Sequence, residues 1–590
     1  MPKPVPAVDV DVADAMATGS GSDSSNNNFA KDNGRGNQPL TSWRLATVMA
    51  SLCVGIFLFG LDVNIIGVAI PHITTEFSSL PDVAWYGAAY LLTLTAFQPL
   101  FGNLYKFFNA KVVYLVSLIL FEVGSAISAA APGSSVLIFG RAFLGLGAAG
   151  LLQGALAIIG NIVTVDRVPI FQSIVISSLV ISVCIGPVIG GALTEYASWR
   201  WCFWINVPAG FLVAIVIFFF VPRTGSSNTA NARLPLRQKL HNMDFPGLVI
   251  FLGLITCLLL ALTWGGGTYV WRDSRIIGLF IGFGLLTAVF CYWLVRRGDS
   301  ALIPLRVLGK RSIYVGALVL TGFGILSVTY GYYLPILFQS VQGVSTTQSG
   351  VRYIALVGSQ IVTTIIVGGL VTTFGVYNVT ISSSTKVPYM IAGGVVCSVG
   401  AGLLTTVDLF TSTPQWAAYL VITGLGLGMA MQLPYTALQA VLDPVDIATG
   451  NAIAVFSFHL AGALGTAIAQ NLLLDGLYVY VPQYTSEVDP SNVIRAGAQG
   501  LTLLAGSSDE ILQALRLAYG QAIRRTVILG LAGACFATCV SPFMEWVNIK
   551  RVADTRVQKN TQQGPVVVEG VEGGSGLVAE GDVAAEKQMG

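Results

Sequence analysis

The feature that most constrains this chain is a succession of apolar runs, each about 20 residues long, the length that an α-helix needs to cross a bilayer. These runs fill most of the segment between residues 45 and 546. Of the 590 residues, 54% are hydrophobic and only 10% are charged. Because a soluble domain carries about 25% charged residues, most of this chain must lie in lipid.

The runs predict an all-α, polytopic membrane protein. A helix satisfies its own backbone hydrogen bonds where no water is available. A transmembrane β-barrel would show alternating apolar and polar residues, whereas these runs are solidly apolar. We therefore expect fourteen transmembrane helices, at residues 45–70, 84–104, 112–131, 136–163, 170–194, 203–221, 245–264, 276–295, 313–337, 351–374, 388–407, 416–440, 449–473 and 524–546.

The two ends of the chain differ from the middle. Residues 1–42 and 551–590 are polar or Gly-rich and lack apolar periodicity, so both are predicted to be disordered tails. Lys and Arg concentrate in the loops that face the cytoplasm if both tails lie there, as the positive-inside rule requires. Arg524 and Arg525, beside the last span, oppose this orientation. The sequon at Asn378 would then be cytoplasmic and unused.

Charge and motif content exclude several classes of function. The net charge of +2 gives no indication of nucleic-acid binding. The three His and eight Cys residues show neither zinc spacing nor a disulfide framework. No nucleotide-binding loop, metalloprotease motif or nucleophile elbow is present in the sequence. We expect no metal, no cofactor and no enzymatic activity; the expected partners are the lipid bilayer, a small organic substrate and protons, and the expected state is a monomer.

Among the ionisable residues inside the predicted spans, three stand out: Asp62, Glu122 and Arg141. Each costs about 3 kcal/mol or more in lipid and is a functional candidate by default. The helical rise places Asp62 roughly 12 Å and Arg141 roughly 8 Å from the outer ends of their spans. We therefore expect these two at similar depth, in contact directly or through water, and Glu122 near the midplane.

These residues admit two interpretations. A carboxyl that is exposed first to one side of the membrane and then to the other can load and release a proton. On this interpretation Asp62 and Glu122 couple proton movement to transport, with Arg141 as the neighbouring cation. The alternative is a structural ion pair or hydrogen bond that fixes helix packing.

The fifth predicted span contains Gly186-Pro187-Val188-Ile189-Gly190-Gly191. Proline removes a backbone donor and kinks a helix, and glycines allow a neighbouring helix to approach closely. The string predicts a hinge or a tight seal between two parts of the bundle. Ordinary glycine packing is the alternative.

Several polar or aromatic side chains within the spans are candidates for a substrate cavity. Each more often makes an interhelical hydrogen bond, worth about 0.6 kcal/mol, than contacts a substrate. One of them is a histidine that either titrates near neutral pH or packs as a lone histidine in the bundle. The scarcity of charges favours weakly charged, partly apolar organic molecules. The candidates are Asn64, Gln153, Gln432, Phe456 and His459.

Three acidic residues lie at the ends of predicted spans. Asp244 precedes Phe245-Pro246-Gly247, a pattern typical of a helix N-cap. Asp443 and Asp446 fall in a turn that faces the cytoplasm. We therefore expect a structural role for Asp244 and solvated side chains for Asp443 and Asp446.

In combination these motifs resemble those of a major facilitator superfamily transporter of the fourteen-span drug:proton antiporter group, in its fungal branch. The resemblance runs from about residue 43 to residue 550. The motifs that carry it are Leu61-Asp62 to Pro71, Arg141 with Gly145 and Gly147, the Gly186 to Gly191 string with Ser182 at its usual leading-glycine position, Trp199 to Gly210, and Tyr333 to Gln339 with Gln342 to Ser345.

The resemblance implies two six-helix halves, residues 43–221 and 301–550, that are related as pseudo-repeats. Between the halves, residues 222–300 form a cytoplasmic loop and two inserted spans. The second half contains a long outer loop near residues 474–523. The resemblance places a substrate cavity at the midplane between the halves. It also implies a proton-coupled exporter of toxins, secondary metabolites or drugs in the plasma membrane, with the vacuolar membrane as the alternative. Uptake by proton symport, for example of an iron chelate, stays open. A membrane enzyme, a non-transporting sensor and a channel are less favoured.

One loop departs from the family pattern. The first cytoplasmic loop has Lys106 where the family has Asp, and Asn109 where it has Gly. Only the Gly102, Leu104 and Lys111 skeleton of that motif remains. The Asp-based charge relay that gates this side in the family is therefore absent in its usual form.

Overall fold

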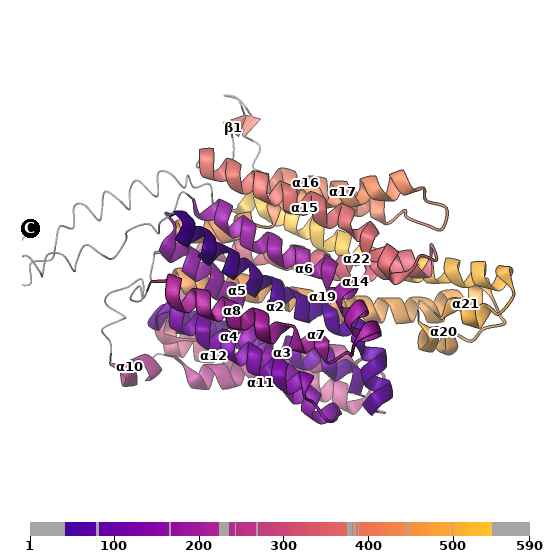
Figure 1. Ribbon diagram of the computed structural model, residues 1–590, viewed down its shortest axis with the longest axis horizontal. Helices are drawn as coiled ribbons and strands as arrows, with labels where there is room; N and C mark the ends of the chain where they lie inside the picture. Colours follow the sequence, from indigo (N-terminus) through magenta and orange to yellow (C-terminus); the bar gives the residue numbers. More distant parts are fainter. Residues whose placement is uncertain are drawn as a thin grey trace, which may run out of the picture.

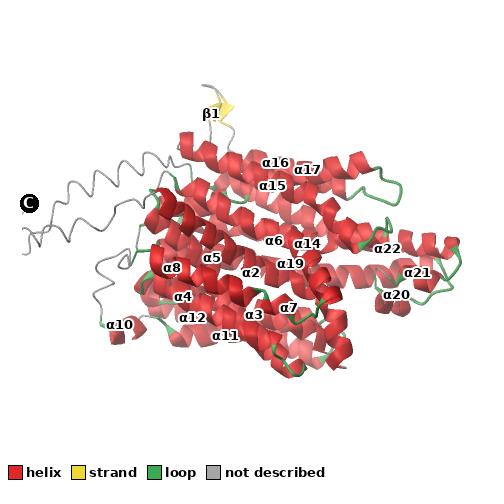
Figure 2. Ribbon diagram, viewed as in Figure 1, coloured by secondary structure: helices red, strands yellow, loops and turns green. Residues whose placement is uncertain are grey.

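The structure, a computed structural model, describes residues 42–77, 82–164, 167–222, 235–241, 243–266, 269–374, 380–381, 385–386, 389–443, 446–497 and 500–545. Over this part of the chain it is a bundle of long helices lying side by side (Figures 1 and 2). The strands among the described residues are one antiparallel pair, β1 (Thr380–Ile381) with β2 (Thr385–Lys386). The all-α fold is confirmed. Asn378 and nearly all of both predicted tails lie outside the described residues.

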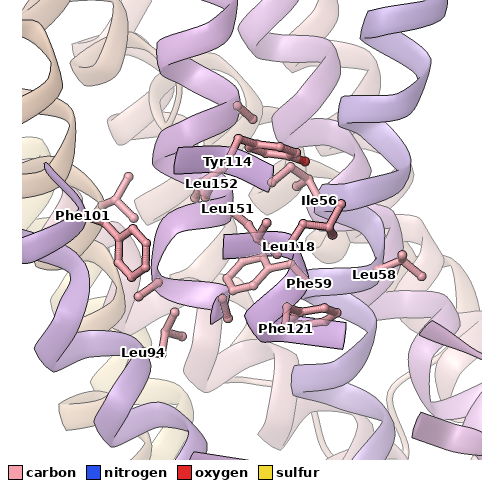
Figure 3. Packing of buried hydrophobic residues seen from close by; sticks show 14 of the residues in the cluster. Ile56, Leu58, Phe59, Leu94, Phe101, Tyr114, Leu118, Phe121, Leu151 and Leu152 are labelled. Atoms are coloured by element: carbon pink, nitrogen blue, oxygen red, sulfur yellow. The ribbon is translucent and has the colours of Figure 1, made fainter. Parts of the chain in front are cut away.

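The N-terminal group of helices comes from residues 42–220. Within it α2 packs along α6, α4 packs along α5, and α3 also contacts α5. These apolar faces bury one hydrophobic core, in which Phe59, Leu118, Phe121 and Leu151 lie together (Figure 3). The group comprises α2 (Ser42–Phe77), α3 (Val83–Phe107), α4 (Ala110–Ala129), α5 (Ser134–Ile162), α6 (Val168–Tyr196), α7 (Trp201–Trp204) and α8 (Asn206–Phe220).

The C-terminal group of helices buries a second core. Here α14 packs along α19 and α22, and α17 packs between α15 and α16. The two groups meet mainly where α3 lies against α19 and where α6 lies against α15. The group comprises α13 (Leu305–Leu308), α14 (Arg311–Ser340), α15 (Thr346–Phe374), α16 (Tyr389–Leu404), α17 (Thr413–Ala430), α18 (Leu433–Val441), α19 (Ile447–Tyr484), α20 (Pro490–Ala496), α21 (Leu501–Ala505) and α22 (Asp509–Val540).

Two helices between these groups, α11 (Phe245–Trp264) and α12 (Ser274–Arg297), pack against each other. Helix α11 lies over the seam between α3 and α19, while α12 leaves most of its surface exposed. The expected N-cap of α11 is confirmed, because the Asp244 carboxylate accepts from Gly247 N at 3.1 Å. The same side chain also accepts from Trp293 Nε1 and Leu302 N, each at 2.8 Å, and so ties the inserted pair together.

The helices match the predicted spans in position. Each of the fourteen predicted spans overlaps a helix of the structure. Eleven helices among the described residues are long and apolar enough to cross a membrane, or twelve if α6 is counted as one bent span. Helix α6 bends by 45° between its segments Val168–Val183 and Val188–Tyr196. The break includes Gly186 and Pro187, so the predicted kink is present, and the missing proline N–H explains it.

The segment predicted as a long outer loop, residues 474–523, differs from that expectation because most of it is helical. Helix α19 continues to Tyr484, and α22 begins at Asp509, well before the predicted start at 524. The short helices α20 and α21 connect them, beyond the ends of the other helices (Figure 1). The reason is local burial: Leu477, Val481 and Leu515 pack into the second core and stabilise helices outside the apolar runs.

Candidate functional site

The ion pair between Asp62 of α2 and Arg141 of α5 lies at the centre of the candidate site. The two side chains are in direct contact and are 0% and 1% exposed, respectively. Arg141 Nε also donates to the backbone oxygen of Tyr86 at 2.8 Å, and its guanidinium stacks 4.6 Å from the ring centre of Tyr90. The structure therefore brings together the two residues that helical rise places at similar depth. The pair is buried, and Asp62 Oδ1 has no hydrogen-bond partner among the described residues.

Glycines set the position of Arg141. A Cβ on Gly145 would lie 2.4 Å from the backbone oxygen of Tyr90, and a Cβ on Gly147 would lie 2.3 Å from the backbone nitrogen of Phe121. Any side chain at these positions would push α5 away from α3 and α4. The close packing holds Arg141, about one turn earlier on α5, against Tyr86 and Tyr90.

The glycines of the α6 string pack against α2 beside Asp62. A Cβ on Gly186 would lie 3.0 Å from the Cβ of Asn64, and a Cβ on Gly190 would lie 3.0 Å from the backbone oxygen of Ile65. These contacts lie within the N-terminal group, and Gly191 follows in the same helix. That the Gly186 to Gly191 string seals two parts of the bundle against each other stays a prediction. The bend in α6 therefore contacts the turn of α2 that contains Asp62.

Glu122 does not join the Asp62–Arg141 pair. It lies on α4 at the seam with α8, where a Cβ on Gly210 would fall 1.7 Å from Glu122 Oε1. Both carboxyl oxygens are buried without a hydrogen-bond partner among the described residues. On the same seam Asn206 Nδ2 donates to Ser125 Oγ at 3.0 Å. An ionised carboxylate is costly in such surroundings, so this group is suited to hold a proton.

Two of the five substrate candidates lie in one polar network across α5, α3 and α19. Gln153 Nε2 donates to the backbone oxygen of Gln98 at 3.0 Å, and Gln98 Nε2 lies 2.8 Å from His459 Nδ1. The His459 ring also makes an edge contact with Phe59, 5.7 Å between ring centres. Gln98 is the member that sequence reasoning did not select, although it is an amide within an apolar span.

The remaining three candidates lie elsewhere. Gln432 Nε2 donates to Gln172 Oε1 at 3.1 Å, which joins the start of α18 to α6. Asn64 donates to the backbone oxygen of Gly60 in its own helix. Phe456 packs against Phe251 of the inserted helix α11, 5.3 Å between ring centres. The structure therefore does not gather all five around one centre.

The remnant of the first loop motif has a structural role at the cytoplasmic ends predicted for α3, α4 and α8. Lys111 Nζ donates to the backbone oxygens of Phe218 at 2.5 Å and Val221 at 2.7 Å, and so caps the end of α8. Cations stabilise a helix C-terminus in this way. Gly102 allows α3 to approach α19, since a Cβ there would lie 2.4 Å from the Cβ of Ala452. Leu104 is half-buried against the first core.

The expectation of a solvated Asp446 is wrong. Its side chain is 2% exposed, whereas that of Asp443 in the same turn is 72% exposed. Asp446 lies 2.9 Å from Arg306 Nη2 and 3.8 Å from Lys106 Nζ. Sequence position alone does not reveal this burial, because both partners come from distant parts of the chain.

Near the opposite ends of the helices, the Trp199 motif contacts the end of α2. Trp199 Nε1 donates to Glu76 Oε2 at 2.7 Å, and Arg200 forms a 2.8 Å ion pair with the same carboxylate. The hydrogen bond from Trp199, supported by Arg200, lowers the pKa of Glu76 below its ordinary value. Arg525, whose position opposes the predicted orientation, pairs with Asp475 at 2.7 Å, so its charge is locally balanced.

The comparisons with known proteins agree with one another. The sequence profile of the Major Facilitator Superfamily matches residues 52–466. An MFS-type efflux pump of Trichophyton rubrum is 40% identical over 513 residues, covering 87% of this chain and 93% of the relative. An efflux pump of Penicillium rubens is 38% identical, covering 87% and 93%. The solved structure of the MFS proton:xylose symporter XylE has a TM-score of 0.56 at 14% identity, covering 88% of this chain and 99% of that one, a likeness of fold alone.

Proposed function

We propose that this chain, which belongs to the Major Facilitator Superfamily of membrane transporters, is a proton-coupled exporter of small, largely apolar organic compounds. The proposal includes fourteen membrane crossings arranged as two six-helix halves, residues 43–221 and 301–550, with α11 and α12 inserted between them. It places both termini in the cytoplasm and the protein, as a monomer, in the plasma membrane. The fourteen helices that overlap predicted spans support the count.

The observation that carries the proposal is the buried contact between Asp62 and Arg141. A buried pair of opposite charges is stable only while both partners remain together. When the helices move so that the pair separates, the Asp62 carboxylate is left buried without its cation and takes up a proton. A proton-loaded Asp62 thus marks one state of the transporter and an ion-paired Asp62 marks the other. Because Asn64 and Ile65, in the same turn of α2 as Asp62, pack against Gly186 and Gly190, the bend in α6 is positioned to respond to this exchange.

Glu122 is proposed as a second proton-holding group. Its two buried oxygens, which have no hydrogen-bond partner among the described residues, suit a group that holds a proton inside the N-terminal group of helices. Its contact with Gly210 makes the site sensitive to the packing of α8.

The substrate is proposed to bind near Gln98, Gln153 and His459, where α3 of the first half meets α19 of the second. The surroundings are amides and aromatic rings rather than fixed charges, which suits weakly charged organic molecules. Export is the proposed direction of transport, and it is supported by several relatives that are named efflux pumps. Proton-coupled uptake is the alternative that the transport assay must exclude.

The test is transport in proteoliposomes with an imposed pH gradient and a panel of hydrophobic toxins. We expect uphill movement of at least one compound by the wild type, in the direction opposite to the proton flux. Asp62→Asn should abolish uphill movement but retain substrate exchange without a gradient. Asp443→Asn, an exposed carboxyl outside the spans, is the matched control and should pump normally. Normal pumping by Asp62→Asn would refute the coupling role, and movement in the same direction as protons would establish uptake.

A further inference from the structure

Two buried glutamine side chains meet between the N-terminal and the C-terminal group of helices. Gln432 Nε2, at the start of α18, donates to Gln172 Oε1 of α6 at 3.1 Å. The two residues are 3% and 0% exposed, respectively. Each keeps one polar atom that has no hydrogen-bond partner among the described residues, Oε1 of Gln432 and Nε2 of Gln172. The pair therefore leaves one carbonyl acceptor and one amide donor buried in the same place.

This result does not depend on the direction in which the two amides face. A carboxamide has an NH2 group as donor and an oxygen as acceptor. If both side chains were turned over, Gln172 would donate to Gln432, and the two atoms left over would again be one oxygen and one nitrogen. A buried polar atom without a partner is costly. A group that supplies one donor and one acceptor together would satisfy both atoms.

The backbone beside Gln432 is interrupted within a helix that is long enough to span the membrane. Helix α17 ends at Ala430 and α18 begins at Leu433, both inside the apolar stretch Thr413–Val441. Pro434, in the first turn of α18, has no N–H with which to continue the helical hydrogen bonds. Interrupted helices of this kind form substrate sites in many transporters. The interruption therefore points, independently of the free amide atoms, to a place where a ligand binds.

The surroundings of the glutamine pair are neutral. Helix α18 contains no charged residue, and the only one in α6 is Glu195, at the end of that helix away from Gln172. A third amide lies next to the pair, where Gln360 Nε2 of α15 contacts Met431 Sδ at 3.6 Å. A carboxylate or phosphate would find no cation on these two helices, so an uncharged polar group fits better.

We propose that Gln172 and Gln432 form a subsite for a secondary amide group of the transported compound. The N–H of that group donates to Gln432 Oε1, and its C=O accepts from Gln172 Nε2. The subsite rests on the proposed function and adds a class of substrate to it, namely small, uncharged compounds that contain a peptide bond or a lactam. Because each group of helices supplies one glutamine, a bound amide contacts both groups.

The test compares two probes that differ in one atom group. The first is the cyclic dipeptide of phenylalanine and proline, which carries a single amide N–H. The second is its ester analogue, in which oxygen replaces that N–H. Equilibrium dialysis measures the binding of each to the purified full chain in detergent. We expect the wild type to bind the amide about tenfold more tightly than the ester, a difference that corresponds to about 1.4 kcal/mol.

A double variant removes the subsite and keeps the fold. In Gln172→Leu with Gln432→Leu, both amides are replaced by apolar side chains, a change that is nearly neutral for stability when both partners go together. Its thermal stability should match that of the wild type, and it should bind the amide and the ester equally. Gln439→Leu is the matched control. Gln439 lies two turns after Gln432 on α18 and contacts Asn451 Oδ1 at 3.4 Å, so its loss should leave the tenfold preference unchanged.

The proposal is overturned if the wild type binds neither probe, if it binds both equally, or if the double variant keeps the preference for the amide. It is also overturned if Gln439→Leu loses the preference as fully as the double variant does. The binding assay uses no proton gradient. Failure of the amide preference therefore leaves export of other compounds intact, and failure of proton-coupled export leaves the binding result interpretable.

Discussion

Replacing Arg141 gives the sharpest test of how the buried pair contributes to stability. Arg141→Met keeps much of the side-chain volume but leaves the Asp62 carboxylate buried without its cation. Breaking a buried pair by removing one partner costs about 3–5 kcal/mol. The contact with the Tyr90 ring, 4.6 Å from the guanidinium carbon, adds about 2 kcal/mol when it is desolvated. The expected loss is therefore about 5–7 kcal/mol, a large share of the stability typical of proteins.

The double variant Asp62→Leu with Arg141→Met removes both charges. Only the ring contact and the hydrogen bond to Tyr86 are then lost, so we expect a cost of about 2–3 kcal/mol. The double variant should thus be more stable than Arg141→Met alone. The assay is reversible unfolding of the purified protein in detergent, followed by tryptophan fluorescence. If the cost of the double variant equals the sum of the two single costs, the two side chains do not interact and the reasoning fails.

Three further predictions concern other contacts. Gly210→Ala should destabilise the protein by about 1–3 kcal/mol, because its Cβ would overlap Glu122 Oε1; thermal unfolding measures this, and wild-type stability would show that Glu122 moves aside freely. Lys111→Met should lower thermal stability by leaving the last carbonyls of α8 without their donor, whereas Lys111→Arg should restore much of it. Since the pKa of Glu76 is lowered in the folded protein, its contribution is fully present above the ordinary carboxyl value of about 4.3 and is lost as the pH falls through the lowered value. The stability difference between wild type and Glu76→Gln should therefore shrink at acid pH, and a difference that grows there would contradict the assignment.

The long apolar runs were sufficient to predict the spanning helices, because length and hydropathy determine where a chain can cross lipid. Depth along the helices predicted that Asp62 and Arg141 lie at similar depth, whereas their direct contact depends on the packing of α2 against α5. Span positions and depth along a helix did not predict the burial of Asp446, because this burial depends on Lys106 and Arg306, which are distant in sequence. The apolar runs also did not predict how far α19 and α22 continue as helices beyond the predicted spans, where tertiary packing stabilises them.

Glu122 and the substrate candidates illustrate the limit of reading polar residues one by one. Counting along its span predicts a midplane position for Glu122, but its contact with Gly210 of α8 depends on how the helices are arranged around α4. Gln98 is indistinguishable in sequence from other amides within spans, and its contact with His459 exists only because α3 meets α19. The resemblance to a family supplies the order of helices but not these contacts.

The central claim is that Asp62 exchanges a proton for substrate. It is tested most directly by adding a transported compound to the detergent-solubilised protein in weakly buffered solution and measuring the protons released with a pH indicator. The wild type should release protons on binding, and Asp62→Asn should bind the compound and release none from this site. Equal proton release by the two proteins, at equal occupancy, would contradict the account.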